Sequence, residues 1–178
     1  MRLFIAIALP ERMRRELARV KIDLQRRSES GRFVPPGNFH VTLHFIGESE
    51  RLADAVSAMR EAVRGIRPFQ LALGEYSSFD RGGSVTSVVT VEGDMRELNA
   101  LYESLQAKLG DYGFKREHRR FRPHITLGRG VVLHPDAEAT LSQTRFESSM
   151  RVNAITLYES LRTQAGMEYV ALHTERLE

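Results

Sequence analysis

The chain has 178 residues, of which 42% are hydrophobic, so it can bury a substantial core within one domain or two small lobes. Its 26 Lys and Arg residues against 23 Asp and Glu residues give a formal charge of +3, which excludes a histone-like polycation. The absence of cysteine excludes disulfides, thiol nucleophiles and thiolate metal sites. No apolar run approaches the roughly 20 residues of a membrane span, so we expect a cytoplasmic protein without membrane attachment.

The hydrophobic pattern predicts strands and helices in alternation along the chain. Pro10 and the segment Ser28 to Gly31 bound the first predicted helix, and Asp94 is placed to cap the third. The segment Asp80 to Gly83 predicts a turn between two strands. No linker rich in Pro, Gly or Ser divides the chain, so we expect a single domain over residues 1–178. We expect strands over residues 3–9, 39–46, 69–79, 85–91, 124–127, 150–161 and 168–172, and helices over residues 11–27, 50–65, 95–109 and 136–143.

A repeated motif carries most of the functional information. The sequence HVTL begins at His40 and recurs as HITL at His124, each copy inside a predicted strand. Chance predicts roughly 0.3 His-x-Thr matches in a chain of this composition. Because strand side chains alternate between faces, His40 shares a face with Thr42, and His124 shares one with Thr126, at a separation of roughly 6 to 7 Å. Each copy therefore offers a polar pair that can grip a phosphoryl group.

Two histidines on one phosphorus centre are suited to phosphodiester hydrolysis. In-line displacement needs a base that takes a proton from water and an acid that protonates the leaving alkoxide on the opposite side. Imidazole serves in either role because its unperturbed pKa is about 6.5. Threonine hydroxyls can donate hydrogen bonds to the non-bridging oxygens. The motifs are nearly identical, so the residues themselves do not assign the acid and the base.

A zinc site is the alternative interpretation of the histidines. Strict alternation places His44 on the same face as His40, which would allow His40, His44 and His124 to act together. The chain lacks the HExxH motif, cysteine ligands and an evident carboxylate companion. We therefore expect no metal, and we expect His44 to form a pocket wall or part of the surface.

Cationic residues flank the second motif. The segment KREHRRFR, from Lys115 to Arg122, holds five cations and one aromatic ring, Phe121, which could guide a polyanion and stack a base. A solvated surface is the other interpretation of this segment. Arg129 follows the motif and suits a phosphate, but strict alternation turns it away from His124. A bulge near Gly128 would be needed to bring Arg129 to the same face.

The sequence resembles a known family over nearly its whole length. The matching segments are RLFIAIALP, FVPPGNFHVTLHFIGE, FRPHITLGR and ITLYESLRTQAGMEYVAL. They are similar to the two-histidine phosphoesterases with paired HxTx motifs, and within these to the bacterial and archaeal RNA 2′,3′-cyclic phosphodiesterases, historically called 2′-5′ RNA ligases. The resemblance implies an α+β, bilobal fold, in which two pseudo-symmetric lobes of antiparallel sheet and helices enclose a central cleft.

The resemblance also implies roles for the motif residues. His40 would donate a proton to the leaving 3′ oxygen, and His124 would accept one from water. Thr42, Thr126 and Arg129 would bind the phosphate. The implied reaction is hydrolysis of RNA 2′,3′-cyclic phosphate ends to a 2′-phosphate, with reversible, ATP-independent 2′-5′ ligation as a further activity of the family.

Other functions stay open at this point. The chain could hydrolyse another small cyclic phosphate or a 2′,5′-linked oligonucleotide, or it could bind RNA ends without turnover. We expect RNA with 2′,3′-cyclic phosphate ends as the partner, no cofactor and no obligate protein partner. We also expect a monomer, because no element presents a self-complementary apolar patch.

Overall fold

A computed structural model of the chain describes residues 1–81 and 84–178. The strands in chain order are β1 (Arg2–Ala8), β2 (Ser28–Phe33), β3 (His40–Glu48), β4 (Phe69–Arg81), β5 (Ser84–Gly93), β6 (His124–Leu133), β7 (Ser149–Val152), β8 (Ala154–Thr163) and β9 (Gly166–Arg176). The helices are α1 (Glu11–Arg26), α2 (Leu52–Ala62), α3 (Met95–Asp111) and α4 (Ala137–Leu141), with a 3-10 turn over Pro36–Asn38.

The strands form two antiparallel sheets. The first sheet has the order β3-β1-β8-β9, and the second has the order β2-β6-β5-β4-β7. The chain passes repeatedly between them, since β1 and β3 belong to the first sheet and β2, between them in sequence, belongs to the second. Strands β3 and β6, which carry the two motifs, contact each other where the sheets meet. This confirms the predicted α+β fold with two lobes of antiparallel sheet.

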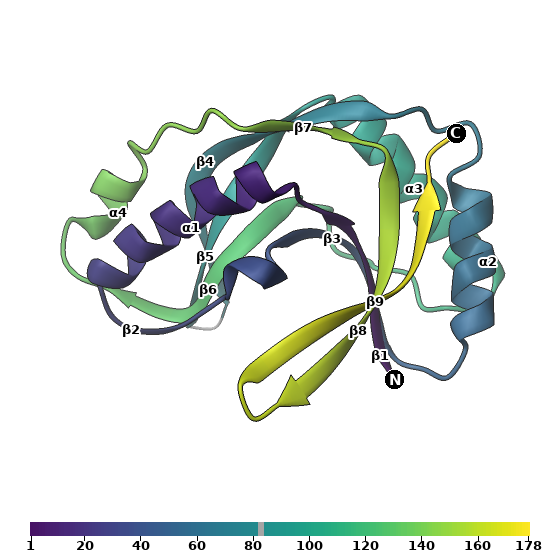
Figure 1. The fold of residues 1–178 in the computed structure, drawn as a ribbon, viewed down its shortest axis with the longest axis horizontal. Coiled ribbons are helices and arrows are strands. Elements are labelled where there is room, and N and C mark those ends of the chain that lie inside the picture. Colours follow the sequence, from purple (N-terminus) through teal and green to yellow (C-terminus); the bar gives the residue numbers. More distant parts are fainter. Residues whose placement is uncertain (82–83) are drawn as a thin grey trace.

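The helices pack on different sheets. Helix α1 packs against β2 and β6 of the second sheet, whereas α2 packs against α3 and against β9 of the first (Figure 1). Helix α1 buries Met13, Leu17, Val20 and Leu24, the positions that its apolar periodicity predicts. The chain therefore crosses between the two sheets after β1, β2, β3 and β7.

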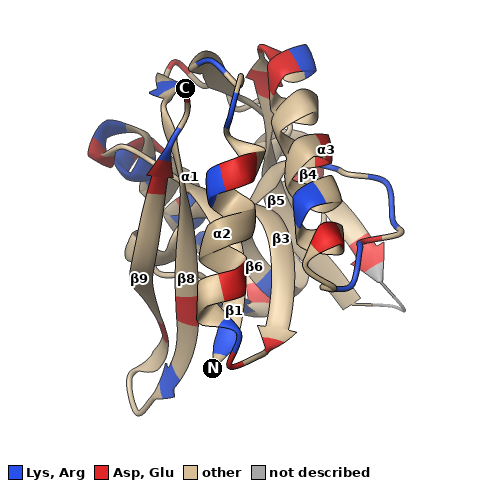
Figure 2. Cartoon of the chain, turned by 90° about the vertical axis from the view of Figure 1, so that its right-hand side faces the viewer, with Lys and Arg blue, Asp and Glu red and all other residues tan. Residues whose placement is uncertain are grey.

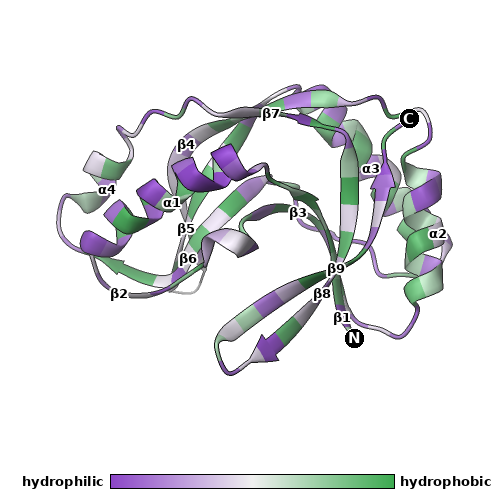
Figure 3. Cartoon of the chain, viewed as in Figure 1, coloured by the Kyte–Doolittle hydropathy of each residue, from purple (hydrophilic) through white to green (hydrophobic). Residues whose placement is uncertain are grey.

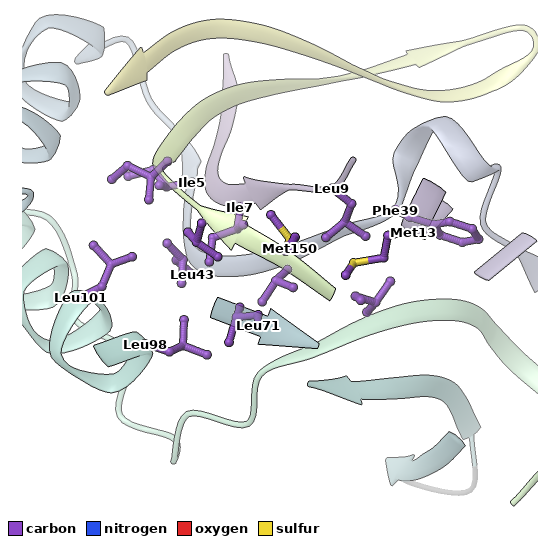
Figure 4. Packing of buried hydrophobic residues seen from close by; sticks show 14 of the residues in the cluster. Ile5, Ile7, Leu9, Met13, Phe39, Leu43, Leu71, Leu98, Leu101 and Met150 are labelled. Atoms are coloured by element: carbon purple, nitrogen blue, oxygen red, sulfur yellow. The ribbon is translucent and has the colours of Figure 1, made fainter. Parts of the chain in front are cut away.

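One cluster of buried side chains extends through both lobes. It includes Ile5 and Ile7 from β1, Leu71 from β4 and Leu98 from α3 (Figure 4). The hydropathy colouring in Figure 3 shows apolar residues alternating with polar ones along the strands, as half-buried sheets require. The alternate residues of the two motif strands belong to this packed core.

The structure corrects several predicted boundaries. Residues 28–31, expected only to end the first helix, belong to β2, whose residues pair with β6. The predicted strand over residues 150–161 is two strands, β7 and β8, in different sheets. Helix α3 begins after Asp94, but the Asp94 carboxylate accepts a hydrogen bond from the backbone N–H of Gln70 (2.8 Å) instead of capping the helix.

Two further expectations concern the turn between β4 and β5 and the lack of a membrane span. The turn predicted between β4 and β5 includes Gly82 and Gly83, which lie outside the described residues. Among the residues that the structure describes, no helix is long and apolar enough to cross a membrane.

Candidate active site

Both motif strands contain a bulge at the same position. In the β1–β3 pair, Thr42 opposes Ala6 and His44 opposes Ile5, so Leu43 is an extra residue in β3. In the β5–β6 pair, the register jumps across Leu127 in the same way. A bulge reverses the alternation of the residues that follow it. The residue five positions after each motif histidine therefore returns to the face of that histidine.

The two motifs face one cavity of about 250 Å³. Both pairs contribute to its lining, His40 and Thr42 from β3 and His124 and Thr126 from β6. Arg129 also lines the cavity, because the bulge at Leu127 turns it to the side of the histidine. The structure thus brings together all five of the predicted site residues.

The two histidines are held by the same backbone contact. The Nδ1–H of His40 donates to the carbonyl of Asn38 (2.7 Å), and the Nδ1–H of His124 donates to the carbonyl of Arg122 (2.6 Å), each two residues earlier in the chain. A carbonyl only accepts, so each Nδ1 carries the hydrogen, and the neutral ring keeps Nε2 as its basic atom. In His40, that Nε2 accepts a hydrogen bond from the Thr42 hydroxyl (2.8 Å).

Each histidine ring also packs against an aromatic ring. The His40 ring lies 5.4 Å from that of Tyr169, at an interplanar angle of 82°. The His124 ring lies 4.9 Å from that of Phe79, at 88°. Tyr169 and Phe79 both line the cavity. These contacts fix the orientation of both rings from opposite lobes.

The surroundings of His40 favour its neutral form. Burial lowers the pKa of His40 to about 4, and the positive charges of Arg129 and of protonated His124 act in the same direction. The hydrogen bond to the Asn38 carbonyl opposes these effects. Without a bound anion, His40 is therefore deprotonated near pH 7.

The prediction that His44 shares the face of His40 is wrong. The bulge at Leu43 turns His44 away from the face of His40, and its side chain is buried. His44 nevertheless contributes to the wall of a larger pocket beside the cavity, as the pocket-wall prediction expects. Its Nδ1 accepts a hydrogen bond from the Nε2 of Gln106 on α3 (2.7 Å). His44 therefore does not join His40 and His124, and no group of three potential metal-ligating side chains is found within residues 1–81 and 84–178.

Sequence reasoning did not select several residues that line the cavity, among them Phe45, Phe79 and Tyr169. Phe45, which occupies the position of Arg129 in the other motif strand, lines the cavity and remains 66% exposed. The exposed ring is available to contact a molecule bound in the cavity. Phe121, expected to be available for a base, stacks on Tyr102 with ring centroids 4.0 Å apart and an angle of 7°, and it also lines the larger neighbouring pocket.

Comparisons with known proteins place the chain in a family. Residues 9–164 match the family model of the 2′-5′ RNA ligase superfamily. A relative from Thermotoga maritima, named RNA 2′,3′-cyclic phosphodiesterase, is 29% identical over 97% of this chain and 94% of its own. A crystal structure of a Thermus thermophilus protein superposes with a TM-score of 0.79 at 26% identity, covering 99% of this chain and 98% of that one. The crystal structure of E. coli LigT complexed with 3′-AMP gives 0.76 at 27% identity, covering 99% and 97%. The chain therefore belongs to the 2′-5′ RNA ligase superfamily.

Proposed function

We propose that the protein hydrolyses the 2′,3′-cyclic phosphate at RNA 3′ ends. The observation that carries the proposal is the convergence of two His/Thr pairs and one arginine on a single cavity. Relatives named RNA 2′,3′-cyclic phosphodiesterase support it, as does the related structure that holds 3′-AMP, a nucleotide with a phosphate on its ribose.

The two imidazoles supply both proton transfers of an in-line displacement. One Nε2 takes a proton from water as the water oxygen attacks phosphorus, and the other gives a proton to the ribose 3′ oxygen as the P–O3′ bond breaks. The product is an RNA with a 2′-phosphate. Since Nδ1 of each ring is bound to a carbonyl, Nε2 is the atom that exchanges protons in both.

The remaining polar groups suit the charged phosphate oxygens. Arg129 offers planar N–H donors that favour phosphate, and the Thr126 hydroxyl lies on the same lining. The Thr42 hydroxyl donates to Nε2 of His40 while that ring is neutral. When His40 is protonated, Nε2 becomes a donor and the Thr42 hydroxyl is released to bind a phosphate oxygen.

We propose His40 as the proton donor and His124 as the acceptor. A donor must be protonated, whereas burial and nearby positive charge hold the pKa of His40 at about 4 without substrate. A bound cyclic phosphate places a negative charge in the cavity, which raises the pKa of a neighbouring histidine. Substrate binding and protonation of His40 are therefore coupled in this assignment.

Phe45 provides the surface for the terminal base. Its ring is exposed on the cavity wall beside the motif residues. A nucleobase stacks on such a ring irrespective of its identity, because every base has a π face. This arrangement favours a nucleotide over a bare cyclic phosphodiester without selecting one base.

The test is hydrolysis of an RNA oligonucleotide with a 2′,3′-cyclic phosphate end by purified variants. We expect His40→Ala and His124→Ala each to lower kcat by at least about 10². His134→Ala is the matched control, since His134 lies outside both motifs and does not line the cavity. Circular dichroism and thermal unfolding confirm that each variant folds. Turnover near that of the unsubstituted protein in both cavity variants would overturn the proposal.

A further inference from the structure

A second pocket of about 530 Å³ continues from the catalytic cavity. Four residues line both, namely Thr42, Phe45, Phe79 and His124. Beyond these, half of the lining residues belong to the irregular segment that follows α3, and the rest come from β3, β4 and Tyr102 of α3. We call this pocket the arginine groove, after its lining residues Arg119, Arg120 and Arg122.

The catalytic cavity is too small for more than part of a nucleotide. Its volume of about 250 Å³ falls below the range of roughly 300–1,000 Å³ that is usual for small-molecule sites. The arginine groove, at about 530 Å³, provides room for a further nucleoside. Because Phe45 lines both spaces, a base stacked on Phe45 lies where one pocket passes into the other.

The groove combines positive charge with aromatic surface. Figure 2 shows Lys and Arg residues, interrupted by an acidic one, along the segment that follows α3 near the right-hand edge of the view. The Arg122 guanidinium lies 5.8 Å from the ring centre of Phe79, and Arg120 is exposed. Two carboxylates, Asp80 and Glu117, also line the groove. Glu117 is engaged by Arg119 (3.4 Å). The three arginines therefore exceed the two carboxylates of the groove by one positive charge.

This wall is held in place although it has no regular secondary structure. The Oε1 of Gln106 accepts a hydrogen bond from the backbone N–H of Glu117 (3.1 Å), and its Nε2 donates to His44 (2.7 Å). Both Gln106 and His44 are buried. The stacking of Phe121 on Tyr102 fixes the next part of the segment to α3. The arginines are therefore presented by an ordered surface.

We infer that the arginine groove binds the penultimate nucleotide of the RNA, with its arginines on the phosphodiester that joins it to the terminal nucleotide. The inference rests on the proposed function. In an RNA with a 2′,3′-cyclic phosphate, both the 2′ and 3′ oxygens of the last ribose are used, so the chain continues only through the 5′ oxygen. A polymer held by its cyclic end must leave the cavity by a route that accepts an anion and a base, and the groove offers both.

The test compares a 2′,3′-cyclic mononucleotide with a dinucleotide that ends in the same cyclic nucleotide. We expect kcat/KM to be about tenfold higher for the dinucleotide, as one added stacking and phosphate contact implies. Arg120→Ala removes most of this preference and leaves mononucleotide hydrolysis within about twofold. Arg120 lines the groove but not the catalytic cavity. Arg64→Ala, the same charge change at an exposed position that lines neither space, leaves both rates unchanged.

A binding measurement separates failure of the inference from failure of the proposed function. Calorimetry on a dinucleotide with a terminal 2′-phosphate and on the matching nucleoside 2′-phosphate requires no turnover. We expect tighter binding of the dinucleotide, with a steeper salt dependence, and we expect Arg120→Ala to remove most of both differences. Equal affinity of the two ligands, or a preference that Arg120→Ala leaves intact, would overturn the groove assignment. Selective binding without hydrolysis of either cyclic substrate would contradict the proposed function alone.

Discussion

Phe45 and Arg129 occupy equivalent positions in the two motif strands, each being the second residue after the extra leucine of a bulge. Both line the same cavity. One presents an aromatic ring and the other a guanidinium. Near-identical strands therefore supply different contacts, with Phe45 placed for a base and Arg129 placed for a phosphate.

Substitution at these two positions is expected to separate base binding from phosphate binding. Arg129→Ala lowers kcat/KM for a cyclic mononucleotide by about 10², since a charged hydrogen-bond donor to the phosphate is lost. Phe45→Ala lowers it by about tenfold, mainly through KM, because stacking is lost. Steady-state kinetics on each variant measures both effects.

A substrate without a base provides the control for this comparison. On ribose 2,3-cyclic phosphate, Phe45→Ala and the unsubstituted protein are expected to hydrolyse at equal rates, whereas Arg129→Ala remains slow. An equal loss in Phe45→Ala on substrates with and without a base would show that Phe45 acts on the motif strand itself and not on the base.

The protonation of His40 is expected to follow occupation of the cavity. Burial lowers the pKa of His40 from its unperturbed 6.5 to about 4 when no anion is bound. An anion beside the ring favours the charged form and is expected to raise this pKa back toward its unperturbed value. Sulfate is a suitable probe, because its own charge does not change as the His40 ring titrates. An NMR titration of the His40 ring with and without sulfate measures the change.

The coupling between His40 protonation and anion binding fixes the direction in which sulfate affinity changes with pH. Protonated His40 attracts the anion, so sulfate affinity is expected to rise as the pH falls from about 7 to about 5. The His40→Asn variant should lose most of this dependence. A His40 pKa that stays near 4 with sulfate bound would contradict its role as proton donor and favour the reverse assignment, with His124 as the donor.

The buried amide of Gln106 is expected to order the arginine groove. Gln106→Leu removes the contacts to both His44 and the Glu117 backbone, which should lower the free energy of unfolding by about 1–3 kcal/mol. Amide hydrogen exchange at Glu117 should accelerate, and the preference for a dinucleotide over a mononucleotide should fall. Gln25→Leu, at an exposed position of α1, is the control. Unchanged exchange at Glu117 would show that other contacts hold this segment.

Much of the site could be predicted from the sequence because the repeated motif is local. Alternation within HVTL and HITL is sufficient to place His40 with Thr42 and His124 with Thr126. The relative position of the two pairs could not be derived from either motif, because it depends on how β3 and β6 meet across two sheets. The resemblance to a known family provided that information.

The errors trace to features that alternation does not encode. A bulge adds one residue without a composition signal in β3, so alternation assigns His44 to the wrong face and gives no reason to select Phe45. The bulge in β6 turns Arg129 toward the cavity, and in this strand Gly128 is a sequence signal for the bulge. Strand β2 (SESGRF) is mostly polar and lies at a sheet edge, where burial imposes little pattern.

The most direct measurement of the central claim is product analysis of an RNA oligonucleotide ending in a 2′,3′-cyclic phosphate, incubated with the purified protein in excess EDTA. The products are resolved as 2′- or 3′-phosphates. Protonation of the 3′ oxygen by a histidine predicts a 2′-phosphate, formed at a rate that EDTA does not change. A 3′-phosphate would contradict the placement of the acid beside the 3′ oxygen, and hydrolysis abolished by EDTA would contradict catalysis by the paired histidines alone.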